Sequence, residues 1–226
     1  MPPLVSVIIT TYNRKEMVRE AIASVQNQDF FDYEIIVVDD GSDDGTETIT
    51  EEFPGIIYFY QKNQGISRSR NQGIELARGK LICFLDSDDL WLPTKLSTQV
   101  KVMGKNPEIP LSYTDEIWIR NGKRINPKKK HQKFSGEIFD KCLPLCIISP
   151  SSVMLQKAIF EVVGWFDESL PVCEDYELWL RITARFQVFF INQKLIIKRG
   201  GHEGQLSQRF WGNDRFRVEG LEKIIT

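Results

Sequence analysis

The chain has 226 residues, of which 42% are hydrophobic and 27% are charged, as is usual for a soluble globular protein. Its 29 Lys and Arg against 31 Asp and Glu leave a net charge of −2, which argues against nucleic acid as the main partner. The longest apolar runs are strand-sized, well short of the roughly 20 residues of a membrane span, and the amino terminus lacks a signal-peptide pattern, so we expect a single cytoplasmic domain over residues 1–226.

Apolar, β-branched runs alternate with helical patterns through the first half of the chain. The runs predict strands over residues 5–10, 34–38, 56–60 and 80–85. Helices are expected after Asn13, which can cap the first of them, over residues 46–53, and up to Gly79, where a left-handed turn fits. This order predicts an α/β fold with a mostly parallel sheet and helices on both faces.

The second half predicts a smaller region of mixed structure. The pair Asn121-Gly122 is a strong hairpin signal between two strands, at residues 111–119 and 123–125, and a basic loop follows over residues 126–133. The other expected elements are helices over residues 92–105, 175–186 and 216–225, and strands over residues 152–155, 188–191 and 195–198.

Polar residues follow three of the predicted parallel strands. They are Thr10-Thr11-Tyr12-Asn13, Asp39-Asp40 and Asp86-Ser87-Asp88. In a parallel sheet, ligands bind beyond the carboxyl ends of the strands, where these residues would meet. The sequence therefore predicts one binding site at this edge of the sheet.

The Asp86-Ser87-Asp88 turn predicts a metal-diphosphate site. Carboxylates suit Mn²⁺ or Mg²⁺, which bind through one or two carboxylates together with substrate phosphates. The alternative is a surface turn whose aspartates cap the helix that follows, because Asp is a common turn residue. The buried strand before the turn and the second acidic strand end favour the metal site.

The run from Asp39 to Gly45 has a competing interpretation, since several of its oxygen-bearing residues have the spacing of an EF-hand calcium loop. Glu47 occupies a position that is normally apolar, and the loop follows a strand rather than a helix, so we disfavour calcium. We expect instead that Asp39 or Asp40 accepts hydrogen bonds from a nucleobase or ribose.

Taken together, these segments resemble the family 2 glycosyltransferases of the GT-A fold. The runs VSVIITTYNR, IIVVDDGSDDGT and NQGISRSRNQGIELARGKLICFLDSDDLW occur in that family's order and spacing, and CEDYELWLR follows later. The resemblance implies an inverting transfer of a sugar from a nucleotide-diphosphate donor. It makes residues 1–100 the nucleotide-sugar-binding half and residues 101–226 the acceptor-binding half with a C-terminal helix.

The resemblance also implies roles for individual residues on the donor side. Asp40 is favoured over Asp39 as the contact to the base. Arg70 would approach the ribose and phosphates of the donor, with Arg68 as a second candidate for that role. Asp88 would hold the metal. The donor-binding residues implied in this way are Thr10, Tyr12, Asn13, Asp39, Asp40, Arg70, Asp86 and Ser87.

On the acceptor side, the resemblance makes Asp175 the general base and Glu174 its neighbour in the family's Glu-Asp pair. The alternative is that either residue only caps the helix that begins there. His202 is a candidate second metal ligand, although a lone histidine is more often a surface or packing residue. Trp165 is a candidate for packing against an acceptor sugar, because sugar rings present apolar faces to aromatic rings.

The expected donor is a UDP-sugar, and the expected acceptor is a glycan, a lipid-linked sugar or a small molecule in polysaccharide synthesis. The basic run Lys128-Lys129-Lys130 could attract anionic acceptors or lipid headgroups at a membrane surface, with a solvated loop as the simpler interpretation.

Other functional classes compete with this interpretation. A phosphatase of the haloacid dehalogenase type also has two aspartates after a strand, but Leu90 stands where Thr or Val is usual. A nucleotidyltransferase lacks support because the amino terminus has no glycine-rich basic loop. A non-catalytic nucleotide-sugar-binding module is disfavoured because Asp88 and Asp175 are both retained.

Overall fold

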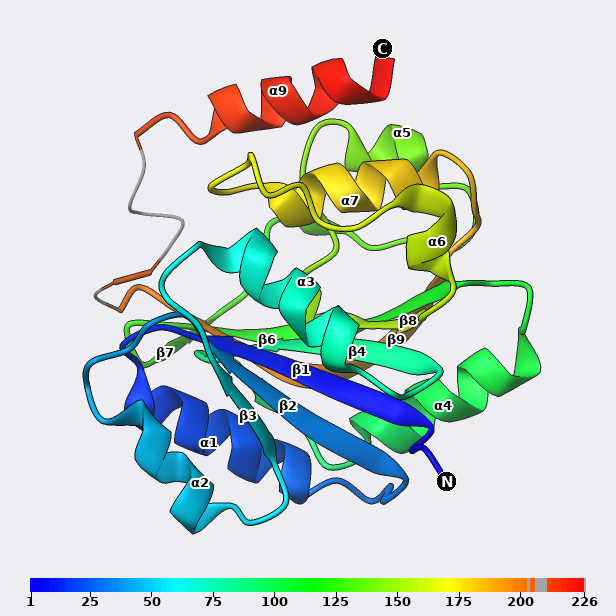
Figure 1. Cartoon of the computed structure of the whole chain (residues 1–226). Helices are drawn as coiled ribbons and strands as arrows, with labels where there is room; N and C mark the ends of the chain where they lie inside the picture. The colour runs from blue at the N-terminus through cyan, green and yellow to red at the C-terminus, as the bar shows by residue number, and fades with distance from the viewer. Residues whose placement is uncertain (203, 206–210, 226) are drawn as a thin grey trace.

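The computed structural model describes residues 1–202, 204–205 and 211–225. Within them, nine strands form one sheet in the order β3-β2-β1-β4-β8-β6-β9-β5, with β7 paired to β6 (Figure 1). Both halves of the chain thus contribute to a single sheet. No helix in this part of the chain is long and apolar enough to cross a membrane.

The first four strands form the parallel part of the sheet. β1 (Val5–Thr11) lies between β2 (Tyr33–Asp39) and β4 (Leu81–Asp86), and β3 (Ile57–Tyr60) pairs with β2. Every residue of β1 is buried, as its unbroken apolar pattern predicts for a strand covered on both faces. The predicted parallel sheet is confirmed.

Helices α1 (Lys15–Gln26) and α3 (Ile66–Leu76) cover opposite faces of these strands (Figure 1). Ile9 of β1 belongs to the apolar cluster that contains one face of α1, whereas Ile8 packs in the cluster that contains Ile74 of α3. Successive side chains of a strand point to opposite faces, so one strand serves both cores.

The remaining elements before residue 92 are η1 (Thr46–Thr48), α2 (Ile49–Glu52) and β5 (Leu90–Trp91).

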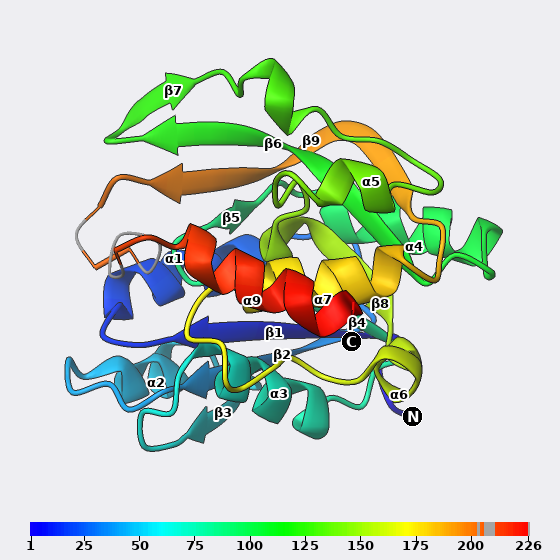
Figure 2. The same cartoon turned by 90° about the horizontal axis from the view of Figure 1, so that it is seen from above.

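The rest of the chain forms the mixed region. Its strands are β6 (Leu111–Arg120), β7 (Lys123–Ile125), β8 (Val153–Gln156) and β9 (Phe189–Gly200). Its helical segments are α4 (Lys95–Lys105), η2 (Lys129–His131), α5 (Phe139–Cys142), η3 (Pro150–Ser152), α6 (Ile159–Val163), α7 (Glu174–Thr183) and α9 (Asp214–Ile225). β8 is antiparallel to β4 and β6, whereas β6 and β9 are parallel. α7 covers the same face as α3, and α9 lies over α7 (Figures 1 and 2).

Asn13 does not cap α1, contrary to the prediction. Its backbone is left-handed, with a φ of 50°, and its Oδ1 accepts a hydrogen bond from the backbone N–H of Asp43 at 2.8 Å. The free N–H of Lys15 donates instead to Asp44 Oδ2 at 2.9 Å. The start of α1 is therefore held by the loop after β2, which sequence spacing along the helix could not reveal.

The prediction of a left-handed turn at Gly79 is also wrong. α3 ends at Leu76, and Gly79 does not have a positive φ. A Cβ at Gly79 would lie 2.6 Å from the backbone nitrogen of Ser6. The glycine is needed here because the chain passes directly against β1.

Two further boundaries differ from the predictions. The two short strands expected over residues 188–198 are one strand, β9, whose pairing with β6 shifts register at Asp115 and so accommodates the polar residues in its middle. The helix expected from Leu92 begins at Lys95, because Leu90–Trp91 first pairs with β9 as β5. Both differences result from long-range pairing.

Candidate active site

A groove of about 310 Å³ opens at the carboxyl ends of β1 and β4, and we call it the central groove. Strand register places Thr10 of β1 beside Asp86 of β4, and the start of α7 faces both from the acceptor half. The charged residues that line the central groove are Arg14, Arg70, Asp86, Asp88, Asp89, Glu174, Asp175, Lys198, Arg199 and Arg217. Acidic and basic groups from both halves of the chain therefore converge here.

A smaller cavity of about 140 Å³ adjoins the central groove, and the two share Thr10 and Ser87. Tyr12 and Asp40 also line this cavity, and Tyr12 is 43% exposed. Of the predicted donor-binding residues, Thr10, Tyr12, Asp40 and Ser87 line this cavity. Arg70 and Asp86 line the central groove instead, and Asn13 and Asp39 line neither.

The two neighbouring aspartates after β2 have different surroundings. Asp39 is buried, and its oxygens accept hydrogen bonds from the Ser42 N–H at 2.9 Å and the Tyr58 hydroxyl at 2.5 Å. Asp40 accepts hydrogen bonds from Gln61 Nε2 at 2.7 Å and from two backbone N–H groups of the loop after β3, and it lines the small cavity. Asp39 thus holds the turn, whereas Asp40 is the one of the two that lines the small cavity.

Arg70 of α3 connects the two halves across the central groove. Its buried guanidinium donates to Asp86 Oδ1 at 2.8 Å and to Glu174, and it lies 5.3 Å from the centre of the Phe166 ring. Although burial opposes the charge, Asp86 and Glu174 raise the Arg70 pKa, so the side chain stays cationic. Arg70 therefore fixes the end of β4 relative to the start of α7.

Glu174 and Asp175 occupy the first turn of α7 but differ in their partners. Glu174 is buried, and burial raises its pKa to about 7 even though Arg70 opposes this shift. Asp175 Oδ1 accepts a hydrogen bond from the Tyr176 N–H at 2.7 Å, and Oδ2 faces the thiol of Cys146 at 3.6 Å. Because a thiol is a weak donor, Asp175 keeps an oxygen that can accept a proton.

Asp88 lies at the junction of the groove with the segment after β9. Its Oδ2 lies 2.7 Å from His202 Nε2 and 3.3 Å from Arg14 Nη1. The predicted pair of metal ligands is thus brought into contact. Within the described residues, no group of three or more His, Cys, Asp or Glu side chains could hold a metal by itself. A divalent ion at Asp88 would need further ligands from a phosphate or from water, as Mg²⁺ usually does.

Five charged residues of the groove were not predicted as site residues from the sequence, namely Arg14, Asp89, Lys198, Arg199 and Arg217. Asp89 is buried and accepts hydrogen bonds from Ser151 Oγ at 2.6 Å and the Arg199 N–H at 2.9 Å, and burial followed by repulsion from Asp88 raises its pKa. Lys198 projects from β9, and the carboxylates of Glu116 and Asp89 raise its pKa although burial opposes this. Only the pairing of β9 with β5 and β6 brings Lys198 to the groove, so no local signal marks it.

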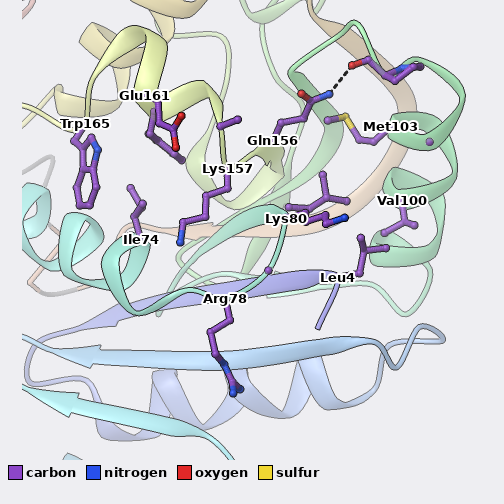
Figure 3. A pocket seen from close by; sticks show the side chains of 16 residues that line it. Leu4, Ile74, Arg78, Lys80, Val100, Met103, Gln156, Lys157, Glu161 and Trp165 are labelled. Carbon is purple, nitrogen blue, oxygen red and sulfur yellow. Dashed lines mark hydrogen bonds between the residues drawn. The ribbon is translucent and has the colours of Figure 1, made fainter. Parts of the chain in front are cut away.

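Trp165 is not brought to the central groove. It lines a separate cavity of about 690 Å³, together with Leu4, Ile74 and Lys80 (Figure 3). Leu4 and Lys80 precede β1 and β4, so this cavity lies at the amino ends of the parallel strands, opposite the carboxylates of the groove. This position does not support Trp165 as an acceptor contact.

Comparison with known proteins adds an independent line of evidence. The family model described as Glycosyl transferase family 2 matches residues 6–164. An uncharacterized glycosyltransferase of Rickettsia typhi is 35% identical over 90% of this chain, and one of Rickettsia prowazekii is 34% identical over 87%. The chain spans 65% and 64% of the lengths of these relatives. The Escherichia coli protein WfgD, named as a UDP-Glc:alpha-D-GlcNAc-diphosphoundecaprenol beta-1,3-glucosyltransferase, is 30% identical over 95% of this chain and 81% of its own length.

Solved structures show the same fold at low sequence identity. Staphylococcus aureus TarS 1–349 in complex with UDP-GlcNAc has a TM-score of 0.81 at 21% identity, covering 99% of this chain and 65% of that one. The mannosyltransferase PcManGT from Pyrobaculum calidifontis, in complex with GDP-Man and Mn²⁺, has a TM-score of 0.73 at 18% identity, covering 100% and 65%. The predicted GT-A fold is confirmed by this likeness.

Proposed function

The chain belongs to the family 2 glycosyltransferases, and we propose that it transfers a sugar from a UDP-sugar to an acceptor hydroxyl with inversion, in the synthesis of a glycan or cell-surface polysaccharide. The observation that carries this proposal is the placement of Asp175 across one groove from Asp86 and Asp88, next to the cavity that Asp40 lines. A donor and an acceptor would then meet between the two halves of the chain.

The small cavity would hold the nucleoside. Asp40 Oδ2 accepts a single hydrogen bond, from the Gly65 N–H at 2.8 Å, among the described residues. A carboxylate oxygen can accept a second hydrogen bond, so Asp40 can bind an N–H group of a uracil ring. Tyr12, which lines the same cavity, would stack against the base.

Asp88 and His202 would hold Mn²⁺ or Mg²⁺ together with the donor diphosphate. Carboxylate oxygen and imidazole nitrogen are both suitable ligands for Mn²⁺, and the 2.7 Å contact between Asp88 Oδ2 and His202 Nε2 supports a site that they share. When bound, the ion would neutralise negative charge on the leaving diphosphate. Arg14, whose guanidinium lies 3.3 Å from Asp88, adds positive charge beside the same position.

Asp175 would act as the general base. The acceptor oxygen forms a bond to the anomeric carbon as the bond from that carbon to the diphosphate breaks, and the bonding electron pair leaves with the diphosphate. The hydroxyl proton passes to Asp175 Oδ2. Glu174 is less suited to this role because Arg70 occupies its carboxylate within the protein.

Metal-dependent nucleotide binding tests the donor site. We expect UDP to bind in the presence of Mn²⁺ and to bind at least about tenfold more weakly with EDTA or in the Asp88→Asn variant, as measured by calorimetric titration. Asp140→Asn, which changes an exposed carboxylate that does not line the groove, serves as the matched control and should bind UDP normally. UDP affinity that is the same with and without metal would contradict the metal site, and phosphomonoester hydrolysis without sugar transfer would favour a phosphatase.

A further inference from the structure

A second groove of about 330 Å³ lies between the β6–β7 hairpin and β9, and we call it the hairpin groove. It adjoins the central groove, because Lys198, Arg199 and Gln205 line both. Figure 2 shows the hairpin and β9 side by side at one margin of the molecule. None of the residues proposed above to bind the donor lines the hairpin groove.

Strand register explains which side chains face this groove. Trp118 of β6 lies opposite Ile125 of β7 on one side and opposite Lys198 of β9 on the other. Residues directly opposite each other in a sheet point to the same face, as do residues two apart in a strand. Trp118, Ile125, Lys198 and Arg120 therefore share one face, and all four line the groove.

Trp118 is held in place at the centre of this face. Its Nε1 donates a hydrogen bond to Glu116 Oε2 at 3.2 Å, and the centre of its ring lies 4.8 Å from the centre of the His131 imidazole. Lys198 Nζ lies 6.0 Å from the centre of the same ring. A fixed, partly exposed indole with a cation beside it can pack against the apolar face of a sugar and leave the cation for a neighbouring anionic group.

The segment that contains the hairpin is basic. Residues 117–133 contain no Asp or Glu and seven Lys and Arg, namely Arg120, Lys123, Arg124, Lys128, Lys129, Lys130 and Lys133, in a chain whose net charge is −2. Of these residues Arg120 lines the hairpin groove, whereas Lys133 pairs with Glu116. Arg120 makes no ion pair within the described part of the chain. Arginine binds phosphate oxygens through paired N–H donors, so an uncompensated arginine at a groove favours a phosphate ligand.

We propose that the hairpin groove is the acceptor subsite and that it selects a phosphate-bearing sugar, with the sugar ring on Trp118 and the phosphate between Arg120 and Lys198. This inference rests on the proposed glycosyl transfer, since it supplies the acceptor for Asp175. A membrane surface would also attract the hairpin's lysines. A surface contact would not require a cavity next to the central groove, and the residues that the two grooves share therefore favour the acceptor.

Binding of glucose 1-phosphate tests the proposal. The full chain is first saturated with UDP and Mn²⁺ so that the donor site is occupied, and glucose 1-phosphate or glucose is then titrated by calorimetry. We expect glucose 1-phosphate to bind at least about tenfold more tightly than glucose, which is the contribution of a charge-assisted hydrogen bond. Arg120→Glu should remove this preference and leave UDP binding unchanged. Lys101→Glu, an equal charge reversal on the exposed face of α4, should behave as the wild type.

Three results would overturn the inference. If glucose binds as tightly as glucose 1-phosphate, the groove does not recognise the phosphate. If inorganic phosphate binds as tightly as glucose 1-phosphate, the groove does not recognise the sugar. Weaker binding of Arg120→Glu to phosphatidylglycerol vesicles, with glucose 1-phosphate binding unchanged, would make the hairpin a membrane surface. If the wild-type protein does not bind UDP, the proposed function is rejected and this inference with it. That outcome differs from the three above, in which UDP still binds.

Discussion

The two halves of the molecule hold their charged side chains in different ways. In the parallel strands β1, β2 and β4 the side chains are largely apolar on both faces, and the carboxylates follow the strand ends. In β6 and β9, charged residues such as Glu116, Arg120 and Lys198 project from the strands themselves. A strand covered on both faces carries charged groups mainly near its ends, as β2 does with Glu34 and Asp39, whereas a strand with one open face can carry them along its length.

The largest expected effect tests whether donor binding and acceptor activation depend on different residues. Asp175→Asn should lower sugar transfer by about 10³-fold, because a neutral amide cannot accept the hydroxyl proton. UDP affinity should change by less than about twofold, because Asp175 is not one of the residues proposed to hold the nucleotide or the metal. Initial rates of UDP release and calorimetric titration measure the two quantities. A parallel loss of UDP affinity would show that donor binding and acceptor activation are not separable.

A second experiment compares the packing of the two halves. Gly79→Ala should lower the free energy of unfolding by about 2 kcal/mol, because its Cβ would meet the backbone of Ser6 at 2.6 Å. Gly104→Ala in α4, where a Cβ has nothing within 4 Å, should raise that free energy by about 0.5–1 kcal/mol through helix propensity. Urea denaturation measures both, and equal effects of the two variants would contradict the close approach at Gly79.

A pH-dependent effect is expected at Lys95, a fully buried cation at the start of α4. Its Nζ donates to Gln99 Oε1 at 2.6 Å and lies 3.9 Å from the centre of the Trp91 ring, and burial lowers its pKa to about 8. Between about pH 8 and pH 10 the unfolded chain retains a proton that the folded chain has released. The contribution of Lys95 to the free energy of unfolding therefore rises with pH in this window, by at most about 1.4 kcal/mol per pH unit.

Lys95→Met removes this contribution. The stability of the variant relative to the wild type should be greatest below about pH 8 and should decline toward pH 10, as measured by urea denaturation at several pH values. Lys101→Met, on the exposed face of the same helix, is the control and should show a constant difference. A pH-independent difference for Lys95→Met would mean that Lys95 titrates normally in the folded state.

Local patterns were sufficient to predict much of the donor half. The unbroken apolar runs of β1 and β2 specify strands that must be buried on both faces, and such strands form a parallel sheet. The polar residues at their ends then meet at one edge, as Thr10 and Asp86 do in the register of β1 with β4. Convergence of these residues follows from strand direction alone and needs no knowledge of distant contacts.

Other features could not be predicted because they depend on contacts between segments far apart in the chain. No local pattern separates Asp39 from Asp40, and only the family resemblance favoured Asp40. The Tyr58 hydroxyl and the loop after β3 give the two carboxylates their different surroundings. Trp165 is of a residue type that packs against sugars. The path of the chain after α6 nevertheless places it at the amino ends of the parallel strands, away from the central groove.

The sequence by itself determined the α/β order of elements, the apolar strands and the acidic strand ends, because these depend on periodicities of a few residues. The tertiary structure decided which carboxylate faces the ligand cavity, how Arg70 joins Asp86 to Glu174, and where Lys198 lies. These arrangements arise when β9 pairs with β6 and when α7 packs beside α3, and the residues they join lie too far apart in the chain for any short pattern to specify them.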